Sequence, residues 1–244
     1  MASYAQRSLA TEPLALAEFA QLVADPVYYG VGVPRGDGRL VAVLPGLFGN
    51  DWYLQPLHLW LARIGYRPVR SSLMVNAGCP ERLSRQVERH LESRLQTQTT
   101  PVVLIGHSRG GILARAIAAR LGDDVSHLVL LGSPVGAIEK SGQWPNSPGD
   151  GNPAHSSVSQ ASNRARSFLD PDCNVPHCGC PFPSDLRRPL SRQTKVVSIY
   201  SSDDPVVPSW SCPVPRAHNI EVSGTHTGLV YNSTVYRELA DALT

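Results

Sequence analysis

Long apolar runs and one-sided charge are both missing from this 244-residue sequence. Nowhere do about 18 apolar residues follow one another, so we predict no membrane-spanning helix. The net charge is only +2, and no basic run exceeds a couple of residues, which argues against a nucleic-acid-binding surface. The stretch 1–26 also lacks the unbroken apolar run of a secretory signal. We therefore expect a soluble, cytoplasmic protein.

Paired C-x2-C motifs are absent as well, although the chain has five cysteines. Three of them cluster in the stretch DPDCNVPHCGCPF, as Cys173, Cys178 and Cys180. This C-x4-C-x-C spacing beside His177 is compatible with a zinc site. Without paired C-x2-C motifs the evidence for zinc is weak, and we predict no metal site. A disulfide that pins the loop is an alternative that would favour an oxidising compartment. A third alternative is that these cysteines are free thiols. The sequence also leaves open whether Cys212 forms a disulfide.

The remaining composition is that of a globular protein. Hydrophobic residues make up 42% of the chain and charged residues 17%. A chain of this length buries roughly 70–75% of the surface that its unfolded form exposes, so it needs no disulfide or metal ion for stability. Because we find no internal repeat and no second core, we predict a single domain over 1–244. The segment 136–190 is rich in Gly, Ser, Pro and Asn, and we expect it to be an insertion that covers the functional site as a lid.

Short apolar runs alternate with helical patterns from residue 39 onward. The runs that we predict as strands cover 40–46, 66–73, 101–106, 125–133, 194–200 and 217–224. The patterns that we predict as helices cover 53–65, 79–96, 111–122 and 233–243. Continuous apolar strands are typical of parallel sheets covered on both faces. We therefore predict an α/β fold, with an open, mostly parallel sheet of about six strands and helices on both faces.

The stretch Gly-His-Ser-Arg-Gly, which spans 106–110, is the most informative motif. It follows a continuous apolar strand and opens a helix, so the chain must turn sharply at Ser108. Such a turn leaves no room for flanking side chains, which explains Gly106 and Gly110. It also holds the serine in a strained conformation with its hydroxyl exposed at the edge of the sheet. The helix N-terminus places a positive dipole end nearby. We predict that Ser108 is a nucleophile.

This serine turn, a Pro-Gly loop before it, and an Asp and then a His after it resemble the α/β-hydrolase superfamily, particularly small bacterial lipases and esterases. The resemblance covers roughly residue 39 to the end of the chain. It implies a parallel core sheet that carries nucleophile, acid and base at its C-terminal edge, in that chain order.

A serine hydroxyl needs a base within hydrogen-bond reach. His226 follows the last predicted strand in a glycine-containing loop, where this family places its base. The base needs a carboxylate that fixes its tautomer. Asp204 leads the sequence Asp-Pro-Val-Val-Pro, which resembles the family pattern for the acid, and the adjacent Asp203 is the alternative.

The resemblance also implies an oxyanion hole made of two backbone N–H groups. One is that of Arg109, directly after the nucleophile. The other comes from the loop after the first core strand, from Leu47 or alternatively from Phe48. Many relatives carry His-Gly where this chain has Pro45-Gly46, and because the donor is main chain this departure need not harm catalysis.

We expect Phe48, Trp52 and Met74 to line the substrate pocket. The predicted function is a serine hydrolase, a carboxylesterase or lipase, that cleaves small-molecule carboxylic esters through an acyl-enzyme on Ser108 without a cofactor. An acyltransferase, thioesterase, lactonase or amidase would use the same three side chains. A non-catalytic ligand-binding relative has no need for all three, which argues against that reading.

Overall fold

The computed structural model describes residues 12–96, 100–141, 164–173 and 179–244. Its six strands form one sheet in the order β2-β1-β3-β4-β5-β6, and each neighbouring pair is parallel. The strands are β1 (Leu40–Leu44), β2 (Arg67–Arg70), β3 (Val102–His107), β4 (Val125–Leu131), β5 (Lys195–Ser201) and β6 (His218–Val222). The predicted open parallel sheet is confirmed.

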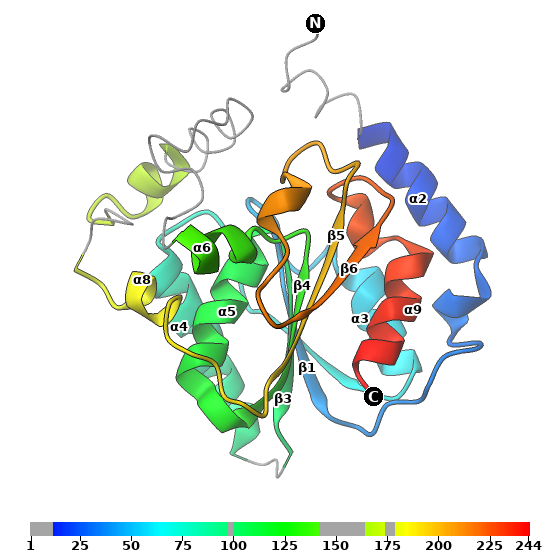
Figure 1. Ribbon diagram of the computed structural model, residues 1–244, viewed down its shortest axis with the longest axis horizontal. Coiled ribbons are helices and arrows are strands. Elements are labelled where there is room, and N and C mark those ends of the chain that lie inside the picture. The colour runs from blue at the N-terminus through cyan, green and yellow to red at the C-terminus, as the bar shows by residue number, and fades with distance from the viewer. Residues whose placement is uncertain (1–11, 97–99, 142–163, 174–178) are drawn as a thin grey trace, which may run out of the picture.

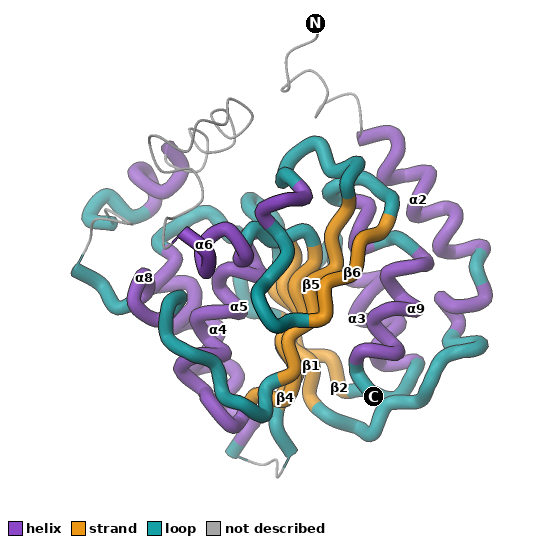
Figure 2. Tube along the Cα trace, in the orientation of Figure 1, coloured by secondary structure: helices purple, strands orange, loops and turns teal. Residues whose placement is uncertain are grey.

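Helices cover both faces of the sheet (Figures 1 and 2). One face carries α2 (Glu12–Ala24), α3 (Gln55–Arg63) and α9 (Ser233–Ala242). The other carries α4 (Pro80–Leu95), α5 (Arg109–Leu121), α6 (Val135–Ser141) and α8 (Phe182–Asp185). Four short 3-10 helices also lie within the described residues: η1 (Pro26–Tyr29), η2 (Gly122–Asp124), η3 (Ser209–Ser211) and η4 (Gly228–Val230).

Strand side chains alternate between two hydrophobic cores. Val41 and Val43 of β1 pack in the core shared with Trp60, whereas Ala42 and Leu44 pack in the core shared with α4 and α5. Each core strand is therefore buried on both faces, which is the physical reason for its continuous apolar sequence. The C-terminal ends of the strands meet at one edge, where the loops that carry the candidate functional residues emerge.

The N-terminal helix α2 lies outside the sheet, beside the C-terminal part of the chain (Figure 1). Leu22 is fully buried in the core, whereas Leu14 and Leu16 are exposed, as expected of a surface helix. The ring of Phe19 meets that of Tyr231 edge-on at 5.4 Å. The helix thus packs on the segment that leads into α9.

The segment 136–190 is more helical than its sequence indicated. It contains α6, a helical stretch over 164–169, and α8. Phe182 is fully buried in the α4–α5 core, whereas Phe168 is exposed. Residues 142–163 and 174–178 lie outside the described residues, so the lid stays a prediction.

Four cysteines fall within the described residues, namely Cys79, Cys173, Cys180 and Cys212, and no disulfide joins any two of them. Cys178 lies outside that part of the chain. The described residues contain no group of three or more His, Cys, Asp or Glu side chains arranged to hold a metal ion. No described helix is both long and apolar enough to cross a membrane.

Candidate active site

The turn between β3 and α5 carries Ser108 in a conformation that few residues adopt, with φ 53° and ψ −123°. A Cβ atom on Gly106 would collide with the backbone of α5, and one on Gly110 would collide with the carbonyl oxygens of Leu44 and Pro45. The steric reason inferred for both glycines from the sequence therefore holds. The Ser108 N–H donates to Leu131 O at 2.8 Å, which fixes the turn to β4.

Ser108, His226 and Asp204 form a continuous chain of hydrogen bonds. The distance from Ser108 Oγ to His226 Nε2 is 2.9 Å, and that from His226 Nδ1 to Asp204 Oδ2 is 2.6 Å. All three residues are at least nine-tenths buried. A carboxylate that accepts from Nδ1–H leaves Nε2 free to accept the serine proton. The arrangement can therefore activate the hydroxyl of Ser108.

The choice between the two neighbouring aspartates is made by the turn after β5. Asp204 Oδ1 accepts the N–H groups of Val206 at 2.7 Å and Val207 at 2.8 Å, which aims Oδ2 at His226. Asp203 is exposed to solvent, and its N–H donates to Ser201 Oγ at 3.0 Å. The structure thus brings Asp204, and not Asp203, to the histidine.

The two backbone donors of the predicted oxyanion hole lie beside this turn. The Arg109 N–H is the first of α5, and a helix leaves its first N–H groups without an internal acceptor. The Phe48 N–H donates to Asn76 O at 3.0 Å, so it is already used. The Leu47 N–H has no acceptor within the described part of the chain. Leu47 is therefore the available donor of that loop. A Cβ on Gly46 would lie 3.2 Å from Ser108 Cβ, which shows how closely the loop approaches.

A buried bridge that the sequence did not reveal joins this loop to the His226 loop. The Tyr53 hydroxyl accepts the Gly46 N–H at 2.6 Å and lies 3.0 Å from His107 Nδ1. His107 Nε2 lies 2.9 Å from the carbonyl oxygen of His226. Because a carbonyl oxygen can only accept, Nε2–H is the donor to it, and Nδ1 of the neutral ring accepts from the phenol. Burial, and the nearby His226, lower the pKa of His107 to about 3, so its ring is neutral.

His107 directly precedes the nucleophile in the sequence, but its ring is hydrogen-bonded to Tyr53 and to the His226 carbonyl and not to Ser108. The sequence did not indicate that His107 hydrogen-bonds the backbone carbonyl of His226 and so supports the loop that carries this histidine. Only the tertiary contact, over 119 residues of sequence, reveals this role.

The His226 loop is also held from the N-terminal helix. The Glu18 carboxylate accepts the Thr225 N–H at 2.9 Å and the Thr225 hydroxyl at 2.6 Å. The same hydroxyl oxygen accepts the Gly228 N–H at 3.0 Å. One carboxylate of α2 therefore fixes both sides of the turn that presents His226. Nothing in the sequence before residue 39 had suggested such a role.

Asn76 ties the loops after β1 and β2 to one another. Its side-chain N–H donates to Pro45 O at 2.7 Å, and its backbone N–H donates to Gly49 O at 2.9 Å. The Arg109 guanidinium donates to the carbonyl oxygens of Asn76 at 3.2 Å and Gly78 at 2.5 Å. Burial lowers the pKa of Arg109 to about 10, with Arg166 adding to the effect, and the group stays cationic at neutral pH.

The predicted pocket residues lie on the loops after β1 and β2, at the same edge of the sheet as Ser108. Phe48 is 49% exposed, Trp52 74% and Met74 90%. The Arg70 guanidinium lies over the Trp52 ring at 5.6 Å. These side chains form an apolar rim that faces solvent, and their contact with a substrate stays a prediction.

Comparisons with known proteins agree with the observed fold. A family model described as the alpha/beta hydrolase fold matches residues 79–211, more than half of the chain. Among solved structures, a protein of unknown function from Staphylococcus aureus subsp. aureus Mu50 aligns with a TM-score of 0.58 and 15% identity, over 86% of this chain and 90% of its own.

Polyneuridine aldehyde esterase aligns with a TM-score of 0.50 and 17% identity, over 85% of this chain and 98% of its own. MGS-MChE2, an alpha/beta hydrolase enzyme from a sediment metagenome of the Mar Chica lagoon in Morocco, has the same score and identity, over 85% and 90%. A search of curated protein sequences found no match. At these identities the structural likeness establishes the fold, and the family model covers more than half of the chain, including the strands β3, β4 and β5. The chain therefore belongs to the α/β-hydrolase fold family.

Proposed function

We propose that this protein is a serine hydrolase that cleaves carboxylic esters through an acyl-enzyme on Ser108. The observation that carries the proposal is the hydrogen-bond chain from Ser108 Oγ through the imidazole of His226 to the carboxylate of Asp204. The nucleophile stands on a strained strand-to-helix turn at the C-terminal edge of the sheet, with its base held beside it.

The first half of the reaction forms the acyl-enzyme. Ser108 Oγ attacks the ester carbonyl carbon while its proton passes to His226 Nε2. The carbonyl oxygen becomes an oxyanion, which accepts hydrogen bonds from the N–H groups of Arg109 and Leu47. One such donor contributes roughly 3–4 kcal/mol to the transition state. Collapse of the intermediate breaks the ester C–O bond, and His226 gives its proton to the departing alkoxide.

The second half regenerates the serine. Water loses a proton to His226 Nε2 and attacks the acyl carbonyl carbon, and the serine oxygen leaves as the proton returns to it. Asp204 stays ionised and stabilises the imidazolium that forms in each half. These steps use only side chains and backbone groups of the chain, so no cofactor takes part in the proposed reaction.

The substrate is a small-molecule ester whose acyl or alcohol part contacts the apolar rim. Phe48, Trp52 and Met74 expose large apolar surfaces on loops at the edge of the sheet that carries Ser108, and such surfaces suit an apolar substituent. Because this rim is open to solvent, we expect short and medium acyl chains to be hydrolysed more rapidly than long ones.

Hydrolysis of p-nitrophenyl esters from acetyl to palmitoyl tests the proposal. We expect turnover by the wild type, loss of turnover in Ser108→Ala, and unchanged turnover in Ser202→Ala, which alters an exposed serine. A fluorophosphonate should label the wild type and not Ser108→Ala. Absence of Ser108-dependent turnover on every ester, together with absence of labelling, would overturn the proposal. Transfer of the acyl group to an added alcohol faster than to water would redirect it to an acyltransferase.

A further inference from the structure

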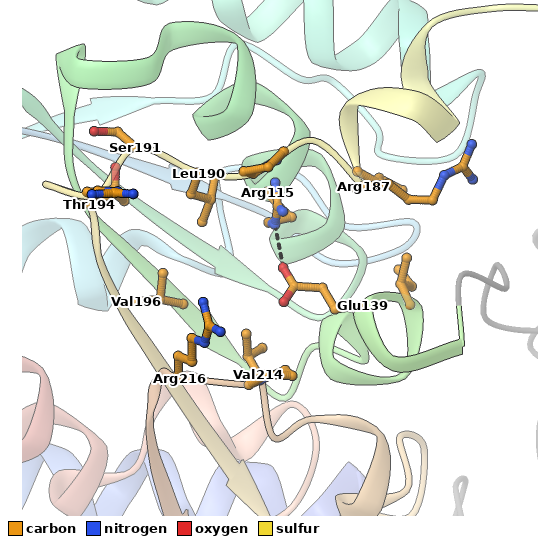
Figure 3. A pocket seen from close by; sticks show the side chains of 14 residues that line it. Arg115, Glu139, Arg187, Leu190, Ser191, Thr194, Val196, Val214 and Arg216 are labelled. Carbon is orange, nitrogen blue, oxygen red and sulfur yellow. Dashed lines mark hydrogen bonds and ion pairs between the residues drawn. The ribbon is translucent and has the colours of Figure 1, made fainter.

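A cavity of about 590 Å³ lies on the α5 side of the sheet (Figure 3). Its walls come from α5, from α6, from the segment 186–196 and from the segment 214–216. None of Ser108, Asp204 and His226 lines it, so it is separate from the candidate active site. A volume of this size accommodates a small organic ligand. Its apolar lining includes Ile138, Leu186, Leu190, Val196 and Val214.

The polar lining of the cavity carries an excess of positive charge. Its charged side chains are those of Arg115, Arg187, Arg192, Arg216 and Glu139. The single carboxylate is already paired, since Glu139 Oε1 lies 2.7 Å from Arg115 Nε. The three other arginines form no ion pair within the part of the chain that the structure describes. An anion that enters therefore meets uncompensated guanidinium groups.

Arg115 is the buried member of this set. Its side chain is only 5% exposed, and its Nη2 donates to Arg188 O at 2.8 Å. Its Nη1 is buried and has no hydrogen-bond partner among the described residues. A buried, charged donor without an acceptor is costly, and a ligand oxygen that accepts from Nη1 would remove this cost. Figure 3 shows Arg216 extending into the same hollow from the wall opposite Arg115.

We propose that this cavity binds an amphiphilic oxyanion, a carboxylate or phosphate group carried on an apolar body. Arg115 and Arg216 hold the oxyanion, because the planar guanidinium fork matches the geometry of carboxylate and phosphate oxygens. Leu190, Val196 and Val214 contact the apolar body. An inorganic anion would leave this apolar lining hydrated, and a neutral apolar molecule would leave the arginines without partners.

Calorimetric titration of the Ser108→Ala protein at low salt tests the site, because binding needs no turnover and this variant cannot be acylated at residue 108. The probes are octanoate, octyl phosphate, inorganic phosphate and octanol. We expect one octanoate or octyl phosphate per chain, at least tenfold tighter than inorganic phosphate or octanol, and weakened by added NaCl. The tighter of the two amphiphiles identifies the head group.

Substitutions then locate the binding. Arg216→Gln should weaken the amphiphile about tenfold, since one charge-assisted pair is lost. Arg67→Gln, which alters an exposed arginine of β2 outside the cavity, should change nothing. Arg115→Met should abolish binding, and if that variant does not fold, Arg216→Gln decides. Equal affinity for octanol and octanoate, no saturable binding of either amphiphile, or equal affinity in Arg216→Gln and Arg67→Gln would overturn the site. Because the readout is binding, loss of the ester-hydrolase proposal would leave this result unaffected.

Discussion

The N-terminal helix should control turnover through a single carboxylate. Glu18 accepts two hydrogen bonds from Thr225, the residue before His226, at 2.9 and 2.6 Å. In Glu18→Ala both acceptors are lost, and the turn that presents the imidazole is freed on that side. A misplacement of about 1 Å at a reacting group can cost roughly 100-fold in rate. Because the Tyr53–His107 bridge still supports the loop from the other side, we expect kcat to fall about 10- to 100-fold.

The effect on stability should be smaller than the effect on rate. A hydrogen bond to a charged group contributes about 1.5–3 kcal/mol when buried. Glu18 is only half-buried, so solvent screening reduces this, and we expect a loss of about 1–2 kcal/mol in the free energy of unfolding. The protein therefore stays folded under assay conditions, and the loss of rate reports the position of His226.

The assay compares kcat and KM for p-nitrophenyl ester hydrolysis in the wild type, Glu18→Ala, Glu18→Gln and Gln21→Ala. Gln21→Ala alters an exposed position of the same helix and should match the wild type. Glu18→Gln keeps one oxygen that accepts the Thr225 N–H, so its kcat should be intermediate. KM should change little, because no substrate contact is removed. A folded Glu18→Ala protein with the kcat of the wild type would refute the reasoning.

Three further predictions concern single side chains. Asp204→Asn should lower kcat roughly 10³- to 10⁴-fold in the ester assay, whereas Asp203→Asn should leave it unchanged; equal effects would mean that the wrong carboxylate was assigned. Burial lowers the pKa of His107 to about 3, so the ring stays neutral in the folded protein while it protonates near pH 6.5 in the unfolded chain. The contribution of His107 to the free energy of unfolding is therefore fully present above about pH 6.5 and is lost as the pH falls from there toward 3. His107 should account for about 2 kcal/mol of the fall in the free energy of unfolding between pH 7 and pH 5, so urea unfolding of His107→Gln should show a fall smaller by that amount, and an unchanged pH dependence would contradict the assignment. Burial also raises the pKa of the Cys212 thiol to about 12, so a thiol reagent at pH 8 should label this cysteine only after denaturation, and rapid labelling of the native protein would show that the thiol is accessible.

The parts of the site that the sequence predicts are those determined by local chain geometry. The turn at Ser108 is dictated within five residues, because the glycines on either side must pass close to neighbouring backbone. Local chain geometry alone does not determine which of Asp203 and Asp204 reaches the histidine. The choice depends on two N–H groups that orient one carboxylate after β5, and that detail is visible only in the folded turn.

The residues that sequence reasoning missed act over long separations. Glu18 and Thr225 are 207 residues apart, and His107 reaches a carbonyl 119 residues away. No periodicity or spacing encodes such pairs, because they arise from how helices and loops pack at one edge of the sheet. The helical content of the segment 136–190 was missed for a related reason. Phe182 is held by the core of α4 and α5 and not by any local helical pattern.

The order of the strands leaves β2 and β6 as the two edges of the sheet, and both are poor templates for pairing with another chain. The β2 edge has only four residues, includes Pro68, and exposes Arg67 and Arg70. The β6 edge exposes His218 and Glu221. Short length, proline and charge all oppose edge-to-edge association. A sheet that is open at both ends is thereby protected from fibrillar aggregation by the residues at its margins.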